Sequence, residues 1–297
     1  MKKFILIVIT IDILLLFVLS MLNIDINTSY DAVNSKDYYA YSMLDKNDYY
    51  KDFEIDFVKN TDNYVASNKQ DLLNIFYSIL NNGYDSYNFK CNLNYENCTN
   101  DIISILNDDI LMSAINNYVS PFNSYSNISL SYVKANEYKL ILNKLYSEDE
   151  IEKINNKILN ISKSILDDDM SDSEKIRAIH DFIVINAVYD NDFDEVSKAS
   201  NLLFTGKALC SGYADLMALF LDNLNIPNFK VITDTHVWNA VYVDGNWLHL
   251  DVTWDDPITS NGIGSIRYDY YLVSTNKLYS LDKTEHSFDK NIYMELA

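Results

Sequence analysis

The sequence predicts an α+β fold, in which amphipathic helices precede a run of antiparallel strands. Two stretches in the middle of the chain begin with Ser and carry Glu three residues later, a pattern typical of a helix start. Further along, apolar and polar residues alternate on both sides of Asp244-Gly245, a dipeptide that favours a tight hairpin turn. Helices that are followed by strands, rather than alternating with them, indicate the α+β class.

Glycine and tryptophan are concentrated in one part of the chain. Five of the six Gly and all three Trp lie between Gly206 and Gly264. Glycine permits tightly turned backbone, and strained backbone gathers at functional sites. We therefore expect the functional site to lie in this stretch.

The length, composition and charge indicate how many domains to expect and which partners to exclude. With 297 residues, of which 48% are hydrophobic, the chain is long enough for one or two domains with a sizeable core. The formal net charge is -20, and no stretch is rich in Lys and Arg. Because binding of nucleic acid needs clusters of basic residues, we expect no nucleic-acid partner.

Residues 1–23 predict export. Lys2 and Lys3 precede an apolar run at residues 4–22 that only a few polar residues interrupt. A spanning helix needs about 20 apolar residues, whereas the core of a signal peptide has about 7–15. A membrane anchor and a cleaved signal peptide both stay open, although Asp12 would be costly inside a bilayer. In either case we expect an extracytoplasmic protein that is membrane-anchored or secreted.

Two further regions are expected before the functional stretch. Residues 24–68 are rich in Asp, Asn, Lys, Ser and Tyr and lack Gly and Pro, which indicates a tether or loosely ordered spacer. Residues 69–146 are expected to form a mostly helical N-terminal α/β region. Its predicted elements are helices at 71–80 and 101–106, a strand at 87–91, and a hairpin of 128–133 with 137–142.

The three cysteines suggest two different roles. Cys91 and Cys98 are close in sequence and would be able to form a disulfide in an oxidising compartment. Two unpaired buried thiols are the alternative, and the sequence leaves both open. Cys210 stands alone, and an odd cysteine in an exported protein is a candidate reactive thiol.

Residues 147–297 are expected to form the second domain. Helices are predicted over 147–166 and 171–187, because each begins with the Ser and Glu pattern of a capping box. A third helix should begin at Cys210 or just before it, and end at 225–227, where Pro227 stands. Strands are predicted at 229–233, 235–243, 246–253 and 268–273.

The register of the predicted hairpin places a His near an Asp. If Asp244 and Gly245 form a two-residue turn, His236 and Asp251 point to the same face of adjacent strands. They are then diagonal partners, about 7–8 Å apart at the backbone, which lets an imidazole reach a carboxylate. The opposite face is mostly Val and Leu, and we expect it to be the core side.

Cys210, His236 and Asp251 together suit acyl transfer. A thiolate is the reactive form of cysteine, and a helix N-terminus or a neighbouring His favours it. His236 would take the thiol proton, while Asp251 would fix the imidazole tautomer and stabilise the imidazolium. The backbone N–H of Cys210 is one candidate donor to an oxyanion. The expected chemistry is attack on an amide, a thioester intermediate, and release to water or an amine.

Other polar residues nearby are interpreted as structural. His180 lies beside the apolar face of its helix, and Trp238 and Tyr213 are expected to pack or to wall the site. His249 shares a face with Asp251 and is interpreted as a bystander. Asn201 is a weak candidate for a side-chain oxyanion donor.

Three ordered blocks carry a resemblance to a known family. They are 206–214 (GKALCSGYA), 236–239 (HVWN) and 247–255 (WLHLDVTWD). Together they resemble the transglutaminase-like superfamily, papain-like thiol enzymes with the chain order Cys, His, Asp, and most closely its bacterial exported members. The resemblance is strong over residues 174–257 and weaker as far as Leu272.

The resemblance implies a fold and a site. It implies a papain/transglutaminase-like core, in which a Cys-bearing helix packs against an antiparallel sheet that carries the His and the Asp. It also implies that Cys210, His236 and Asp251 are the catalytic residues. One departure is Val237, which stands where the family often has Ala.

These observations lead to one expected function and two alternatives. We expect an exported thiol peptidase acting on peptide substrates, such as cell-wall peptides, without a cofactor. The alternatives are a protein cross-linking transglutaminase, in which a Lys amine replaces water, and a non-catalytic surface binding module on the same fold. We expect no metal site, because the remaining His are scattered and Cys210 has no Cys neighbour.

Overall fold

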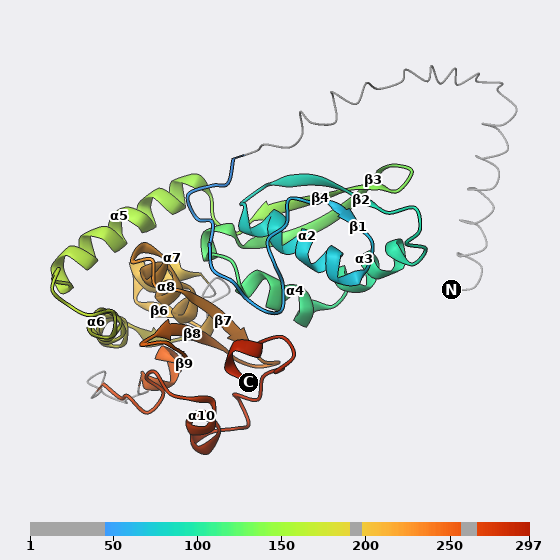
Figure 1. Ribbon diagram of the computed structural model, residues 1–297. Helices are drawn as coiled ribbons and strands as arrows, with labels where there is room; N and C mark the ends of the chain where they lie inside the picture. Colours follow the sequence, from blue (N-terminus) through green and yellow to red (C-terminus); the bar gives the residue numbers. More distant parts are fainter. Residues whose placement is uncertain (1–44, 191–197, 257–265) are drawn as a thin grey trace, which may run out of the picture. The chain divides into compact units, whose positions relative to one another are not determined.

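The computed structural model describes residues 45–190, 198–256 and 266–297 (Figure 1). The predicted anchor or signal peptide at 1–23, and the part of the predicted spacer before residue 45, lie outside the described residues. Within the described ranges, no helix is both long enough and apolar enough to cross a bilayer.

The N-terminal half of the described chain contains a sheet with helices beside it (Figure 1). The strand order is β1-β2-β4-β3, and β3 and β4 form the predicted antiparallel hairpin. The strands are β1 (Val65–Ala66), β2 (Ser86–Cys91), β3 (Tyr125–Lys134) and β4 (Glu137–Lys144). The helices are α2 (Lys69–Asn81), α3 (Cys98–Leu106), α4 (Asp109–Asn117) and the 3-10 turn η1 (Pro121–Asn123). This region is therefore more mixed than the mostly helical one predicted.

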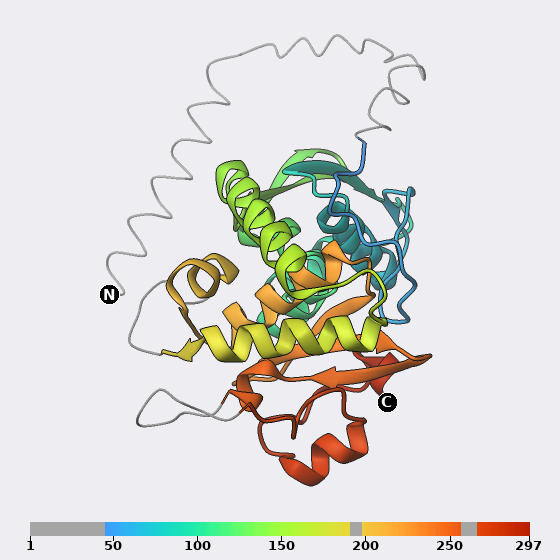
Figure 2. The ribbon, with the colours of Figure 1, turned by 90° about the vertical axis from the view of Figure 1, so that its left-hand side faces the viewer.

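Two long helices follow, and both begin as the sequence predicts. They are α5 (Glu148–Ile165) and α6 (Asp172–Asn186). Ser147 and Ser171 each accept the N–H of the Glu three residues later, and each Glu returns a bond to the Ser backbone. These reciprocal bonds satisfy donors that a helix start otherwise leaves unpaired. Figure 2 shows α6 running alongside the C-terminal sheet.

The helix α8 (Cys210–Asn223) forms the centre of the C-terminal half. Ten of its residues, from Gly212 to Leu221, are buried. It contacts α6, the short helix α7 (Ala199–Thr205), and two strands of the C-terminal sheet. The predicted apolar helix is therefore confirmed, and both its sides are covered.

The C-terminal sheet has the order β7-β8-β9 and is antiparallel. Its strands are β7 (Asn228–Ile232), β8 (Val237–Val243) and β9 (Asn246–Leu250). Asp244 and Gly245 form the predicted two-residue turn, with φ of 53° and 79°, so Val243 pairs with Asn246 as predicted. Positive φ at both positions is what this turn requires, which explains the Asp-Gly pair. Smaller elements are β5 (Val188–Tyr189), β6 (Lys207–Ala208), α10 (Thr275–Leu281) and η2 (Met294–Leu296).

The last two predicted strands are partly wrong. β9 ends at Leu250, and the chain turns into the short helix α9 (Val252–Asp255). The reason is local, because the Asp251 side chain accepts the N–H of Trp254 and so caps α9. Residues 268–273 contribute only an isolated bridge between His249 and Val273 instead of a strand.

The prediction of one core face on the β8–β9 hairpin is also wrong, because both faces are buried. Val241 and Leu250 belong to the hydrophobic cluster around α8. Trp238 and Ala240, on the opposite face, belong to a second cluster shared with α2, α3 and α4. The sheet is therefore covered on both sides. The alternating residues of β8 and β9 face two different clusters, and neither set faces solvent.

Residues 45–68 do not behave as the predicted spacer. Ile55 is 4% exposed and Val58 is fully buried in the cluster shared with α2. The ring of Phe53 lies 5.8 Å from that of Trp247. Few apolar residues stand in this segment, but those present reach the core. The same cluster joins residues on both sides of the predicted domain boundary at 146/147.

Of the two alternatives for Cys91 and Cys98, the structure has the disulfide. Cys91 and Cys98 form a disulfide with a Cα–Cα distance of 6.1 Å. Cys210 is a free thiol and is partly exposed.

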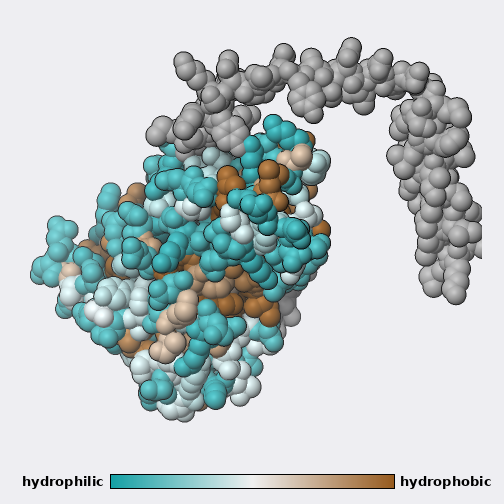
Figure 3. Space-filling view, turned by 45° about the vertical axis from the view of Figure 1, so that its right-hand side comes forward, coloured by the Kyte–Doolittle hydropathy of each residue, from teal (hydrophilic) through white to brown (hydrophobic). Residues whose placement is uncertain are grey.

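The face in Figure 3 is largely hydrophilic, with apolar residues in smaller groups, in agreement with the net charge of -20.

Candidate active site

Cys210 is placed at the first position of α8 by a tight turn. Gly206 ends α7 with φ +74°, and a Cβ at this position would lie 2.9 Å from the Asn186 carbonyl oxygen. Residues 207–208 then pair with β5, and α8 begins at Cys210. The first N–H groups of a helix have no carbonyl partner inside it and carry partial positive charge. The sulfur therefore lies where a negative charge is favoured.

His236 is held just before β8. Its backbone N–H donates to the Thr233 hydroxyl at 3.1 Å, and its carbonyl accepts the Thr233 N–H at 2.9 Å. Its ring stacks on Trp238 with a centroid distance of 5.6 Å and an interplanar angle of 16°. The side chain is nearly buried, so its orientation is fixed by these contacts.

The Asp251 carboxylate binds Nε2 of the His236 ring. His236 Nε2 and Asp251 Oδ2 are 2.6 Å apart, which makes Nε2–H the donor to the carboxylate. Burial alone would lower the pKa of His236, but the charge and hydrogen bond of Asp251, together with a hydrogen bond and charge from Cys210, raise it to about 10. Burial would raise the pKa of Asp251, yet His236 and His286 lower it to about 2. The three predicted residues therefore come together as two ion-pairing partners beside a sulfur.

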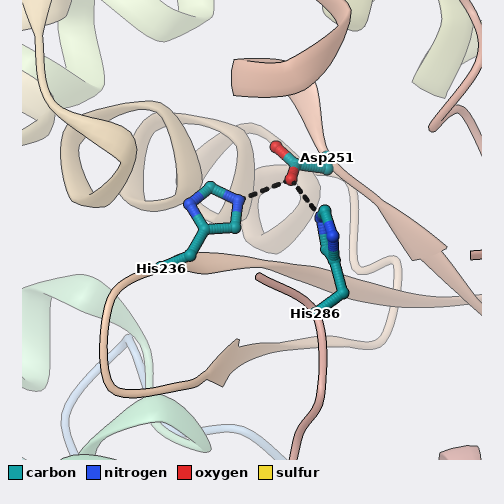
Figure 4. A group of neighbouring side chains, drawn as sticks. All are labelled: His236, Asp251 and His286. Carbon is teal, nitrogen blue, oxygen red and sulfur yellow. Dashed lines mark hydrogen bonds and ion pairs between the residues drawn. The ribbon is translucent and has the colours of Figure 1, made fainter. Parts of the chain in front are cut away.

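His286 is a fourth member that the sequence did not reveal. Its Nε2 lies 3.0 Å from the same Oδ2 of Asp251, so the carboxylate oxygen lies between two imidazoles (Figure 4). The side chain is fully buried. His286 follows Asp251 by 35 positions in a stretch without regular elements, and no periodicity marks it. The stated reason for excluding a metal site, that the remaining His are scattered, is therefore wrong.

The same three side chains have the donor types of a metal site. One ligand atom from each of His236, Asp251 and His286 lies within 4.8 Å of the others. Two imidazoles and a carboxylate are ligands that zinc accepts. Each Nε2, however, is already hydrogen-bonded to the carboxylate. The arrangement as it stands is a proton-linked cluster.

His249 lies next to this cluster without bonding to Asp251. Its Nδ1 accepts the Trp238 Nε1–H at 3.0 Å, so the ring proton is on Nε2, which faces the Thr275 hydroxyl at 3.0 Å. Burial and the nearby His286 lower the pKa of His249 to about 3. A neutral imidazole that orients Trp238 fits the expected bystander role.

His180 has a structural position, as predicted. It is fully buried and bonds Asp255 in α9 at 3.2 Å and Asp181 in its own helix at 2.9 Å. Asp255 also accepts the Tyr270 N–H at 3.0 Å. His180 therefore ties α6 to the helix that Asp251 caps.

Two tyrosines lie on the Cys210 side of the site. Burial and the charge of Cys210 raise the pKa of Tyr189, and its ring lies 6.5 Å from that of Tyr213. Tyr213, one turn along α8, is buried and donates its hydroxyl to Asp256 at 2.5 Å. Asn201, the weak oxyanion candidate, lies within α7, and its role stays a prediction.

A cavity of about 570 Å³ lies at the other end of α8. Its lining includes Leu219, Asp222 and Asn223 from the end of the helix and Lys51 from the N-terminal segment. Cys210 is not among the residues that line it. The candidate site is therefore defined by the geometry of its side chains and not by this cavity.

Comparisons with known proteins gave one family match and several similar solved structures. Residues 160–252 match the family described as the transglutaminase-like superfamily. Among solved structures, the chain is similar to a crystal structure of a TGase, with 16% identity, coverage of 48% of this chain and 47% of that chain, and a TM-score of 0.35. It is also similar to a candidate cysteine protease from Cytophaga hutchinsonii, with 16% identity, coverage of 43% and 61%, and a TM-score of 0.29.

These matches include only part of each chain. The chain spans less than two thirds of the length of either solved structure. No curated protein matches the sequence. The family match, in contrast, includes Cys210, His236 and Asp251. Residues 160–252 of this α+β chain are therefore similar to the transglutaminase-like superfamily, over a stretch that holds all three candidate residues.

Proposed function

We propose that this protein is a thiol enzyme that cleaves amide bonds through Cys210, His236 and Asp251, and that it acts as a peptidase. The observation that carries the proposal is the hydrogen bond from His236 Nε2 to the Asp251 carboxylate at 2.6 Å, in a ring whose pKa is raised in part by Cys210. Such an arrangement activates a nucleophile and orients the base that serves it.

The first half of the reaction forms a thioester. Because the pKa of His236 is raised to about 10, the ring holds the proton of Cys210 at neutral pH, and the sulfur attacks the carbonyl carbon of the substrate amide as a thiolate. The oxyanion is stabilised by N–H groups of the first turn of α8. The imidazolium then gives its proton to the leaving nitrogen, the C–N bond breaks, and an amine departs.

The second half releases the acyl group. Water attacks the thioester as His236 takes one of its protons, and the C–S bond breaks. The products are a carboxylic acid and the regenerated thiol. If a Lys amine replaced water, the product would be a new amide bond, which is the cross-linking alternative. Access of water to the thioester decides between the two.

The proposal includes an extracytoplasmic location. The apolar run at residues 4–22 supports export, and the Cys91–Cys98 disulfide supports an oxidising compartment. The proposed partners are protein or peptide substrates, including cell-wall peptides, and a membrane contacted through the N-terminal segment. No cofactor enters the proposed reaction.

The proposal can be tested by alkylation and by substrate profiling. Purified protein is treated with iodoacetamide across a pH series, and an unbiased peptide library is incubated with wild type and Cys210→Ala. We expect fast alkylation at Cys210 near neutral pH, and cleavage products that Cys210→Ala does not form. Ser211→Ala, at the next position of the same helix, is the matched control and should cleave like wild type.

Two results would contradict the proposal. One is a Cys210 that stays inert to iodoacetamide at every pH tested. The other is cleavage that persists in a folded Cys210→Ala variant. Incorporation of a labelled amine into a glutamine-containing protein, without hydrolysis, would support the cross-linking alternative. A folded Cys210→Ala variant that retained full biological activity would favour the binding module.

A further inference from the structure

His286 is a fully buried imidazole that the proposed reaction does not use. Its Nε2 lies 3.0 Å from Asp251 Oδ2, and its Nδ1 lies 3.1 Å from the backbone carbonyl oxygen of Asp282. A carbonyl oxygen only accepts hydrogen bonds, and so does an ionised carboxylate. Asp251 accepts the Trp254 N–H on Oδ1 and the His236 Nε2–H on Oδ2, as an ionised carboxylate does. Both bonds of His286 therefore form only when both ring nitrogens carry a proton.

The surroundings of His286 suit a positive charge. The ring of Tyr270 stacks on it at 5.3 Å with an interplanar angle of 19°. The rings of Trp238 and Trp254 lie 4.9 and 5.1 Å away at steep angles. Aromatic rings attract cations through their negative faces, and the attraction grows when water is excluded. The Asp282 carboxylate, 3.9 Å from Nδ1, adds a further negative charge.

The charges of the reactive site indicate why a cationic His286 would be favourable. In the reactive state, the proposed thiolate, the His236 imidazolium and the Asp251 carboxylate together carry one net negative charge. An uncompensated charge is costly inside a protein. A cationic His286 brings the summed charge of these four groups to zero. The four side chains can then lie among buried aromatic rings without losing the ion pair that the reaction needs.

We propose that His286 is a positioning residue, which, as an imidazolium, holds the Asp251 carboxylate against His236 and balances the charge of the reactive site. The proposal rests on the proposed function, because His286 acts through Asp251 and never touches the substrate. It is distinct from a metal site at the same cluster, in which a cation would replace the two Nε2 protons.

The first test uses the alkylation rate of Cys210, which needs no known substrate. His286→Gln keeps an amide donor near Asp251 but cannot carry charge, and His286→Leu removes both the donor and the charge. We expect alkylation near neutral pH to slow by about tenfold or more in His286→Leu and by less in His286→Gln. His249→Gln is the matched control, because His249 is equally buried and contacts the same Trp238 but does not bond Asp251. It should alkylate like wild type.

Asp251→Asn separates this inference from the proposed function. If Asp251→Asn alkylates as fast as wild type, the Cys-His-Asp site itself fails and His286 has nothing to act through. If Asp251→Asn is slow while a folded His286→Leu is as fast as wild type, only the His286 proposal is overturned. Equal losses in His286→Gln and His249→Gln would also overturn it, because a general packing defect would then explain both.

A second measurement reads the protonation state of His286 directly in the unmodified protein. Nitrogen-15 NMR of protein with labelled histidine reports the protonation of each ring nitrogen. His286→Gln assigns the His286 signals by their loss. We expect both His286 nitrogens to be protonated at neutral pH, in spectra that a chelator leaves unchanged. A neutral tautomer, or spectra that change on chelation because a metal ion held the cluster, would overturn the proposal.

Discussion

Asp251 serves both the backbone and the site with one carboxylate. Its Oδ1 accepts the Trp254 N–H and so ends β9 by starting α9, while its Oδ2 accepts from His236 and His286. The turn of the chain and the orientation of the base are thereby fixed by the same group. A substitution here changes local folding as well as chemistry.

The pair of Asp251 and His236 predicts how stability depends on pH. The pKa of His236 is raised from 6.5 to about 10, so its contribution is fully present below 6.5 and is lost as the pH rises through about 10. The pKa of Asp251 is lowered from 3.8 to about 2, so its contribution is present above 3.8 and is lost as the pH falls through about 2. Asp251→Asn should therefore reduce the free energy of unfolding most between pH 3.8 and 6.5, by about 3 kcal/mol.

Urea unfolding of wild type and Asp251→Asn, at one pH inside this window and one on each side, checks the prediction. Asp244→Asn is the control, because Asp244 is exposed at the hairpin turn and Asn also tolerates its positive φ. A stability difference that stayed constant across the pH range would show that the charges do not matter and that only shape does.

Sequence reasoning located the residues whose positions follow from local rules. The start of α8 at Cys210 and the β8–β9 turn follow from Gly206, Asp244 and Gly245, so the pairing of His236 with Asp251 could be predicted from spacing. His286 could not be found this way, because its contact with Asp251 is made by a stretch without periodicity. The strand predicted to continue past Leu250 was wrong, because the capping bond of Asp251 outweighed the alternating pattern.

At the scale of elements, a buried ion pair joins α8 to the sheet. Lys230 of β7 bonds Asp215 of α8, and both side chains are under a tenth exposed. The second carboxylate oxygen of Asp215 is 3.2 Å from the Tyr146 hydroxyl. These contacts lie within the helix that carries Cys210. Alternating patterns in the sequence did not reveal them, because a Lys in a strand usually faces water.

Removing both partners of this pair should cost less stability than the two single removals added together. Lys230→Met leaves a buried Asp215 charge unpaired and should cost about 3 kcal/mol of stability. The double variant Lys230→Met with Asp215→Leu should lose clearly less than the sum of the single losses, by about 1 kcal/mol or more. Urea unfolding of the four proteins measures this coupling. Lys175→Met, which breaks an exposed pair with Asp172, is the control and should cost about 0.5 kcal/mol or less. Strict additivity would contradict the prediction.

At the scale of the whole described chain, the C-terminal sheet lies between two hydrophobic clusters. One face of the β8–β9 hairpin belongs to the cluster around α8, and the other belongs to the cluster of α2, α3 and α4. The segment at 45–58 adds to the second cluster. The composition of residues 45–58, which is rich in Asp and lacks Gly, did not predict that the segment packs against this cluster. Its burial depends on a few apolar residues such as Ile55 and Val58.

The second cluster predicts that residues 147–297 do not fold alone, although the sequence suggested that boundary. The ring of Phe229 lies 4.9 Å from that of Tyr118, and the Tyr118 hydroxyl donates to the Ile292 carbonyl at 2.7 Å. Cutting the chain at 146 would expose Phe229 and Tyr293, which are nearly fully buried and whose rings pack against that of Tyr118. Each exposed large side chain costs about 1.5–3 kcal/mol, and two of them consume a substantial part of the about 5–15 kcal/mol that stabilises a domain.

The comparison is between fragments 45–297 and 147–297, each followed by urea unfolding and by the alkylation rate of Cys210. We expect 45–297 to unfold in one cooperative transition and to keep fast alkylation at Cys210, because both clusters are intact. Fragment 147–297 should lack a cooperative transition and should alkylate at the rate of an unfolded thiol, because β7 and β8 lose one covered face. A cooperative transition in 147–297, with wild-type alkylation, would show instead that the transglutaminase-like core is stabilised by the α8 cluster alone.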